Sequence, residues 1–112
     1  MELQHWSYAT SVRDEPFVLR EIKKVGMSKH AVGKLEEAMW RVEVGLAKPH
    51  ETSKVRGDVL ELRVNQDKRW YRLLFARVND DYVALLLGAK KTNRLDDGWI
   101  TTALQRLEDH RA

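Results

Sequence analysis

Four basic side chains occupy positions where the sequence predicts β-strands to run or to end. Arg63 and Arg72 lie inside two apolar segments, and Lys90 and Lys91 follow a third. A planar guanidinium binds a phosphate through two parallel hydrogen bonds, and a lysine ammonium adds a compact point charge. These residue types therefore predict a surface that binds phosphate groups.

Strand parity predicts that these cations share a face. In the segment 59–64 the period of two places Leu60, Leu62 and Val64 on one face, with Glu61 and Arg63 on the other. If the three segments are neighbours in one sheet, Arg63, Arg72 and the two lysines converge across it.

A purely structural interpretation also fits these residues. Arg72 lies in a segment that is apolar in both registers, and a buried charge without a partner is costly. Glu61 could be that partner in a structural ion pair. Lys90-Lys91 could equally be the solvated end of a strand, so the sequence leaves both alternatives open.

The elements that would position these residues follow from hydrophobic periodicity and from proline and glycine signals. Asp14 and Glu15 are expected to cap a helix with Pro16 at its first position and Gly26 at its end. The predicted elements are a strand over 3–9, a helix over 14–26, a helix from 28 to 46, strands over 59–64, 70–78 and 82–89, and a helix over 97–110.

The second predicted helix carries an apolar stripe and is broken by the segment 47–51, which contains Pro49. Helices followed by a run of strands favour an α+β fold, in which the helices pack on one face of an antiparallel meander of three strands. The stripe consists of Val32, Leu35, Ala38, Met39, Val42 and Leu46.

Composition restricts the class of protein. The 112 residues suffice for one domain, 1–112, and the absence of cysteine excludes disulfides and thiolate metal sites. No signal peptide or membrane span is apparent, so we expect a cytoplasmic protein without a membrane partner. The net charge is +3, and the basic excess lies in residues 63–112, a weak indication of a polyanionic partner.

Three linked motifs resemble the RelE/HigB-like toxins of type II toxin–antitoxin systems, in particular the branch first described from phage proteins. The first runs from Arg56-Gly57 to Glu61-Leu62-Arg63, the second is Tyr71-Arg72-Leu73-Leu74-Phe75, and the third is Leu86-Leu87-Gly88-Ala89-Lys90-Lys91-Thr92 before a helix. The segment 14–18 also looks like the start of the family's first helix. The resemblance therefore spans most of the chain.

This resemblance implies a RelE-like fold and a metal-independent mRNA endonuclease that needs no cofactor and inhibits translation. In many members the enzyme cleaves mRNA in the decoding site of the small ribosomal subunit, and a helix-turn-helix antitoxin neutralises it. Cleavage would proceed by attack of the RNA 2′-hydroxyl on the adjacent phosphate. Charge then develops on the phosphoryl oxygens, where preorganised cations stabilise it.

By position, the resemblance assigns phosphate and transition-state contacts to Arg63, Arg72 and Lys91, with Lys90 as a supporting contact or general acid. The general base stays open between Glu51 and His50 of the segment 48–51, and Glu61. Further RNA contacts are expected from Arg56, Tyr71 and Arg94.

The chain departs from the family at Gly88, where an aromatic residue usually precedes the two lysines. Trp70 or Tyr71 could supply a stacking surface instead. The departure keeps open an alternative function, a non-catalytic RNA- or protein-binding phage or regulatory module on the same fold. A purely structural role, with the cations on a solvated surface, is the third hypothesis.

Overall fold

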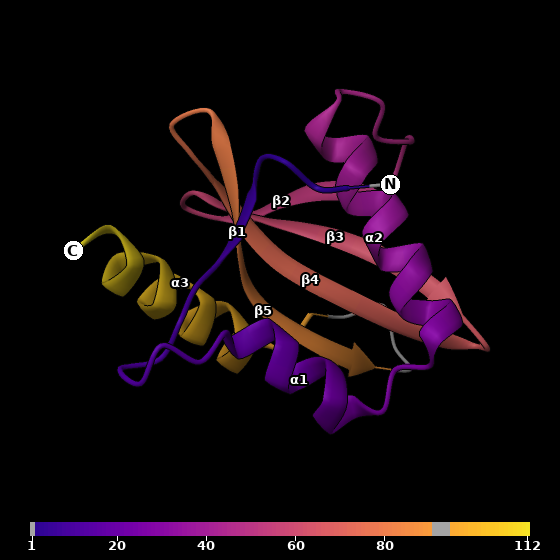
Figure 1. The fold of residues 1–112 in the computed structure, drawn as a ribbon, viewed down its shortest axis with the longest axis horizontal. Helices are drawn as coiled ribbons and strands as arrows, with labels where there is room; N and C mark the ends of the chain where they lie inside the picture. The colour runs from indigo at the N-terminus through magenta and orange to yellow at the C-terminus, as the bar shows by residue number, and fades with distance from the viewer. Residues whose placement is uncertain (1, 91–94) are drawn as a thin grey trace.

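Five strands form one mixed sheet in a computed structural model that describes residues 2–90 and 95–112 (Figure 1). The strand order is β1-β5-β4-β3-β2; β1 runs parallel to β5, and the other neighbours are antiparallel. The α+β prediction, with a meander of three strands and a final helix, is confirmed. The elements are β1 (Trp6–Tyr8), α1 (Phe17–Val25), α2 (Lys29–Glu43), β2 (Thr52–Arg56), β3 (Val59–Gln66), β4 (Arg69–Val78), β5 (Asp81–Lys90) and α3 (Asp97–Arg111).

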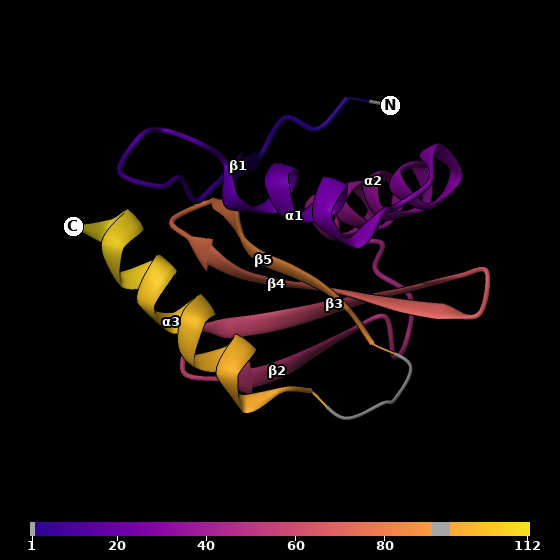
Figure 2. The ribbon, with the colours of Figure 1, turned by 90° about the horizontal axis from the view of Figure 1, so that it is seen from below.

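The helices cover both faces of the sheet (Figure 2). The helices α1 and α2 pack on one face, over a core that includes Leu62, Leu73 and Phe75, whereas α3 packs on the other face, over Leu74 and Leu85. The expectation that all helices lie on one face is therefore wrong for α3. The physical reason lies in β4 and β5, whose central residues are buried in both registers, so that both of their faces need a cover.

The strand β2 was missed by the sequence prediction. Its residues, Thr52–Arg56, include only one apolar side chain and show no alternation. It is an edge strand that pairs only with β3, and a shift in register interrupts that pairing between Lys54 and Arg56. An edge strand needs no continuous apolar pattern because one of its sides faces solvent.

The helix ends differ from the prediction at two points. Pro16 is the N-cap of α1 rather than its first helical residue, and no side chain caps that end; Gly26 ends the helix at a φ of 72°, as expected. The helix α2 ends at Glu43, so Leu46 lies beyond it with 61% of its surface exposed and does not belong to the buried stripe. Among the described residues, no helix has the length and apolar character required to cross a membrane.

Candidate phosphate-binding site

Two of the predicted cations lie directly opposite each other on neighbouring strands. Arg63 of β3 pairs with Arg72 of β4, which in turn pairs with Gly88 of β5. Their side chains lie on the face that α3 covers, because the intervening Leu62, Val64 and Leu73 belong to the core under α1 and α2. The predicted convergence of Arg63 and Arg72 is thus present in the structure.

Glu61 supplies the counter-charge between the two arginines. Like charges in opposite cross-strand positions repel each other, so this pair requires a carboxylate nearby. One oxygen of Glu61 accepts a hydrogen bond from Arg72 Nη1 at 2.9 Å, and the other lies 3.4 Å from Arg63 Nε. Glu61 and Arg72 are both buried. The structural ion pair and the shared cationic face, which the sequence offered as alternatives, therefore occur together.

A cavity of about 330 Å³ opens beside this cluster. Strands β2, β3 and β4 form one side of it, and the segment before α3 together with the first turn of α3 forms the other. With two arginines and one glutamate, the cluster retains one net positive charge. The cavity is lined by Ser53, Lys54, Val55, Glu61, Arg63, Arg72, Leu95 and Ile100.

The turn over residues 48–51 fixes the position of Arg63. The guanidinium of Arg63 donates from Nη2 to the backbone oxygen of His50 at 2.7 Å, and its backbone N–H donates to the oxygen of Glu51 at 2.9 Å. The His50 side chain is exposed, and its backbone has a φ of 65°. The turn therefore contributes backbone carbonyls that orient the arginine.

Glu51 is held by α2. Arg41 donates to both carboxylate oxygens, from Nε at 3.1 Å and from Nη2 at 2.5 Å, and the backbone N–H of Lys48 donates to one of them at 3.0 Å. Burial would raise the pKa of Glu51, but the hydrogen bonds from Arg41 and Lys48 outweigh it and hold this pKa below its ordinary value. A carboxylate with a lowered pKa is a weaker proton acceptor.

Lys90 lies on the same face but does not line the cavity. Its Nζ donates to the Asp96 carboxylate at 3.0 Å and lies 5.1 Å from the centroid of the Trp99 ring. The hydrogen bond from Lys90, with a further one from the backbone of Gly98, lowers the pKa of Asp96. The cap of α3 thereby fixes the Lys90 side chain.

Gly88 and Trp99 form a complementary pair beside the arginines. A Cβ atom placed on Gly88 would lie 2.3 Å from Cη2 of Trp99 and 2.6 Å from two further ring atoms, so only a residue without a side chain fits there. The six-membered ring of Trp99 thus occupies the space above residue 88. An aromatic ring from α3 therefore covers the strand at Gly88.

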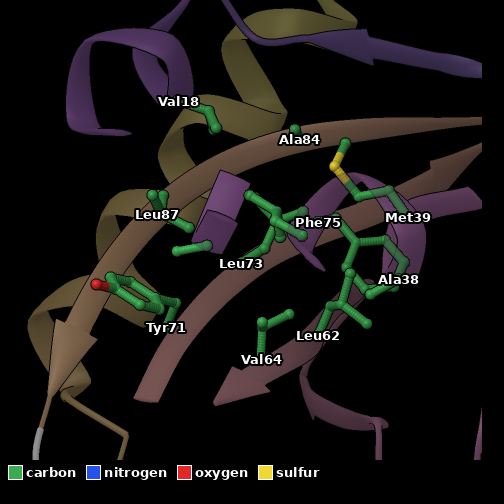
Figure 3. Close-up of a cluster of buried hydrophobic side chains, with 12 residues drawn as sticks. Val18, Ala38, Met39, Leu62, Val64, Tyr71, Leu73, Phe75, Ala84 and Leu87 are labelled. Carbon is green, nitrogen blue, oxygen red and sulfur yellow. The ribbon is translucent and has the colours of Figure 1, made fainter. Parts of the chain in front are cut away.

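The other predicted site residues are dispersed. Tyr71 is buried among the apolar side chains under α1 and α2, on the opposite face from the arginines (Figure 3). Arg56 is exposed at the end of β2, with Asp97 at 3.7 Å. Lys91 and Arg94 lie outside the described residues. Of the two aromatic residues considered for stacking, the structure places only Trp70 on the face of Arg72.

Several residues around the site had not been identified from the sequence. Asp96 and Trp99 come from the start of α3, and Ser53 comes from the missed strand β2. Asp96 carried a usable signal, since an aspartate immediately before a helical segment is a typical N-cap. No local pattern marked Trp99, because its role depends on Gly88, far away in the sequence.

Comparison with protein families assigns the chain to a class. The model of the family described as "Phage derived protein Gp49-like (DUF891)" matches residues 17–108, and the chain belongs to this family. The family is part of the RelE/HigB-like toxin superfamily, whose toxins are endoribonucleases. No curated protein matches the chain.

Proposed function

We propose that this protein is the toxin of a type II toxin–antitoxin system of the HigB-like branch and that it cleaves mRNA on the ribosome without a metal ion. The observation that carries the proposal is the cluster of Arg63, Arg72 and Glu61 beside a cavity on the sheet face. Membership in the Gp49-like family adds an antitoxin as the expected protein partner.

The electrostatics of the cluster suit a phosphodiester. Attack of the 2′-hydroxyl on phosphorus places added negative charge on the phosphoryl oxygens, and fixed cations stabilise that charge without reorganising. Arg63 is already oriented by the His50 carbonyl, and its side chain is 29% exposed, so it is positioned to contact the phosphate. Arg72 is almost completely buried and adds its charge from the wall of the cavity.

The three candidates for the general base differ in their hydrogen-bond partners and in their position relative to the cavity. Arg41 binds the Glu51 carboxylate and helps to lower the pKa of Glu51, and the imidazole of His50 is exposed. Glu61 is the candidate that lines the cavity itself. We therefore favour Glu61 as the proton acceptor, acting once the incoming phosphate draws Arg63 away from it.

Induced expression in a bacterium tests the proposal. Wild-type protein should stop growth and produce mRNA fragments with 2′,3′-cyclic phosphate ends, whereas Arg63→Gln should abolish both effects at equal protein levels. Arg77→Gln is the matched control, because Arg77 lies on β4 with 61% of its side chain exposed and outside the cavity. Intact mRNA and normal growth with well-expressed wild type would refute the proposal.

A non-catalytic RNA-binding module is the second candidate. In the described part of the chain, the carboxylates of Glu51 and Glu61 are both bound to arginines. This candidate is favoured because such a carboxylate is less available to accept a proton. This candidate predicts RNA binding that weakens with salt and produces no cleavage products. Cyclic phosphate ends that disappear in Arg63→Gln would exclude it.

A further inference from the structure

A second polar cavity lies next to the candidate site, between α2 and the turn over residues 48–51. Its volume is about 210 Å³, and Arg63 lines both cavities. The residues around it come from α2, from the turn and from the end of β3. They are Lys34, Glu37, Arg41, Lys48, Glu51, Arg63, Val64 and Asn65.

The edge of β3 explains how one arginine reaches both cavities. The pairing of β2 with β3 begins at Thr52 and Leu62, so the residues of β3 that follow have no neighbouring strand on that side. The turn occupies this edge, and the guanidinium of Arg63 reaches over it to the His50 carbonyl. The Arg63 side chain therefore borders the cavity on the sheet face and also the cavity beside α2.

The charge of the second cavity favours an anion. Arg41 and Glu51 neutralise each other in a close ion pair. Of the remaining charged groups, Lys34, Lys48 and Arg63 are basic and only Glu37 is acidic. Within residues 2–90 and 95–112, neither lysine has a carboxylate at ion-pair distance. The exposed ammonium groups of Lys34 and Lys48 and the guanidinium of Arg63, which the His50 carbonyl orients, thus all line this cavity.

We propose that this cavity binds a second phosphate of the same RNA strand, the one next to the phosphodiester held at Arg63 and Arg72. The inference rests on the proposed function for the identity of the ligand as RNA. Lys34 and Lys48 provide the contacts, and Arg63 is shared between the two phosphates. Contacts of this kind neutralise the backbone without reading the base, so the cavity increases affinity for any sequence.

Binding of short RNAs of two lengths tests the inference. The probes are a dinucleotide with one phosphodiester and a tetranucleotide with three, both made non-cleavable by 2′-O-methyl groups and labelled for fluorescence anisotropy. The double variant Lys34→Gln/Lys48→Gln should bind the tetranucleotide about tenfold more weakly, with a salt slope reduced by about 0.7 for the lost phosphate contact. It should bind the dinucleotide as the wild type does.

A charge-matched variant provides the control. Lys23→Gln/Lys29→Gln removes two exposed lysines outside this cavity and should leave both probes unaffected. Equal weakening of both probes by Lys34→Gln/Lys48→Gln, or none, overturns the second phosphate site while RNA cleavage by the wild type persists. Absence of mRNA cleavage by the wild type in the induced-expression assay refutes the proposed function, and the identity of the second site's ligand with it.

Discussion

Replacing Gly88 by alanine tests whether the pair with Trp99 determines how α3 sits on the sheet. The new methyl carbon would lie 2.3 Å from Cη2 of Trp99. An ordinary carbon contact of about 3.5–4.0 Å requires the ring to move by about 1.2–1.7 Å. The ring is rigid and belongs to a packed helix, so the substitution should cost about 1–3 kcal/mol as overpacking. Removing a glycine from a strand returns about 0.5–1 kcal/mol, so the middle of the two ranges gives a net loss of about 1.2 kcal/mol.

Urea unfolding followed by circular dichroism measures this loss, because the signal does not depend on Trp99. Gly33→Ala is the matched control: a Cβ at Gly33, inside α2, meets no atom within 4 Å, and alanine there should stabilise the protein by about 0.5–1 kcal/mol. In a Trp99→Leu background, Gly88→Ala should become neutral or stabilising. The reasoning is wrong if Gly88→Ala is as stable as the wild type, or if its effect is the same in both backgrounds.

Two further predictions concern the charged groups of the site. Among the residues that the structure describes, Arg72→Met leaves buried Glu61 with only the more distant guanidinium of Arg63 beside it. The free energy of unfolding should therefore fall by about 3 kcal/mol in urea titrations, and a loss below about 1 kcal/mol would contradict the buried ion pair. Glu51 has a pKa below its ordinary value of 4.5, so its pairing with Arg41 stabilises the fold fully above that pH, and this contribution is lost as the pH falls through the lower folded-state pKa. The free energy of unfolding of Glu51→Gln should therefore fall less steeply than that of the wild type as the pH decreases through this range. An unchanged pH dependence would show that the pair contributes nothing.

The three central strands, β3 to β5, and their cationic face were predictable because they depend on local periodicity. The alternation in 59–64 placed Arg63 and Glu61 on the same face, and the apolar run around Arg72 predicted both its burial and its need for a partner. In the structure Glu61 is the partner of Arg72. Parity, however, says nothing about which helix covers which face, so the position of α3 was not predictable from it.

The remaining parts of the site depend on contacts between residues far apart in the sequence. Trp99 fills the space above Gly88, and Arg41 of α2 holds the turn that carries Glu51. A glycine in a strand indicates a close approach by another group without identifying that group. The family resemblance offered Glu51 as one of three candidates for the general base, and the hydrogen bonds of its carboxylate with Arg41 and Lys48 were not predictable from the sequence.

The balance of charge at Glu61 links the fold to the proposed chemistry. Two opposed arginines without a carboxylate would repel each other and destabilise the sheet, whereas two carboxylates would leave no charge for a phosphate. One glutamate between Arg63 and Arg72 permits folding and leaves one net positive charge on this cluster of three residues, beside a cavity that Lys54 also lines. The unequal distances, 2.9 Å to Arg72 and 3.4 Å to Arg63, mark Arg63 as the arginine that an incoming phosphate would recruit more readily. On the proposed function, phosphate binding at Arg63 would then release the Glu61 oxygen that faces Arg63, and this oxygen would accept the proton of the attacking hydroxyl.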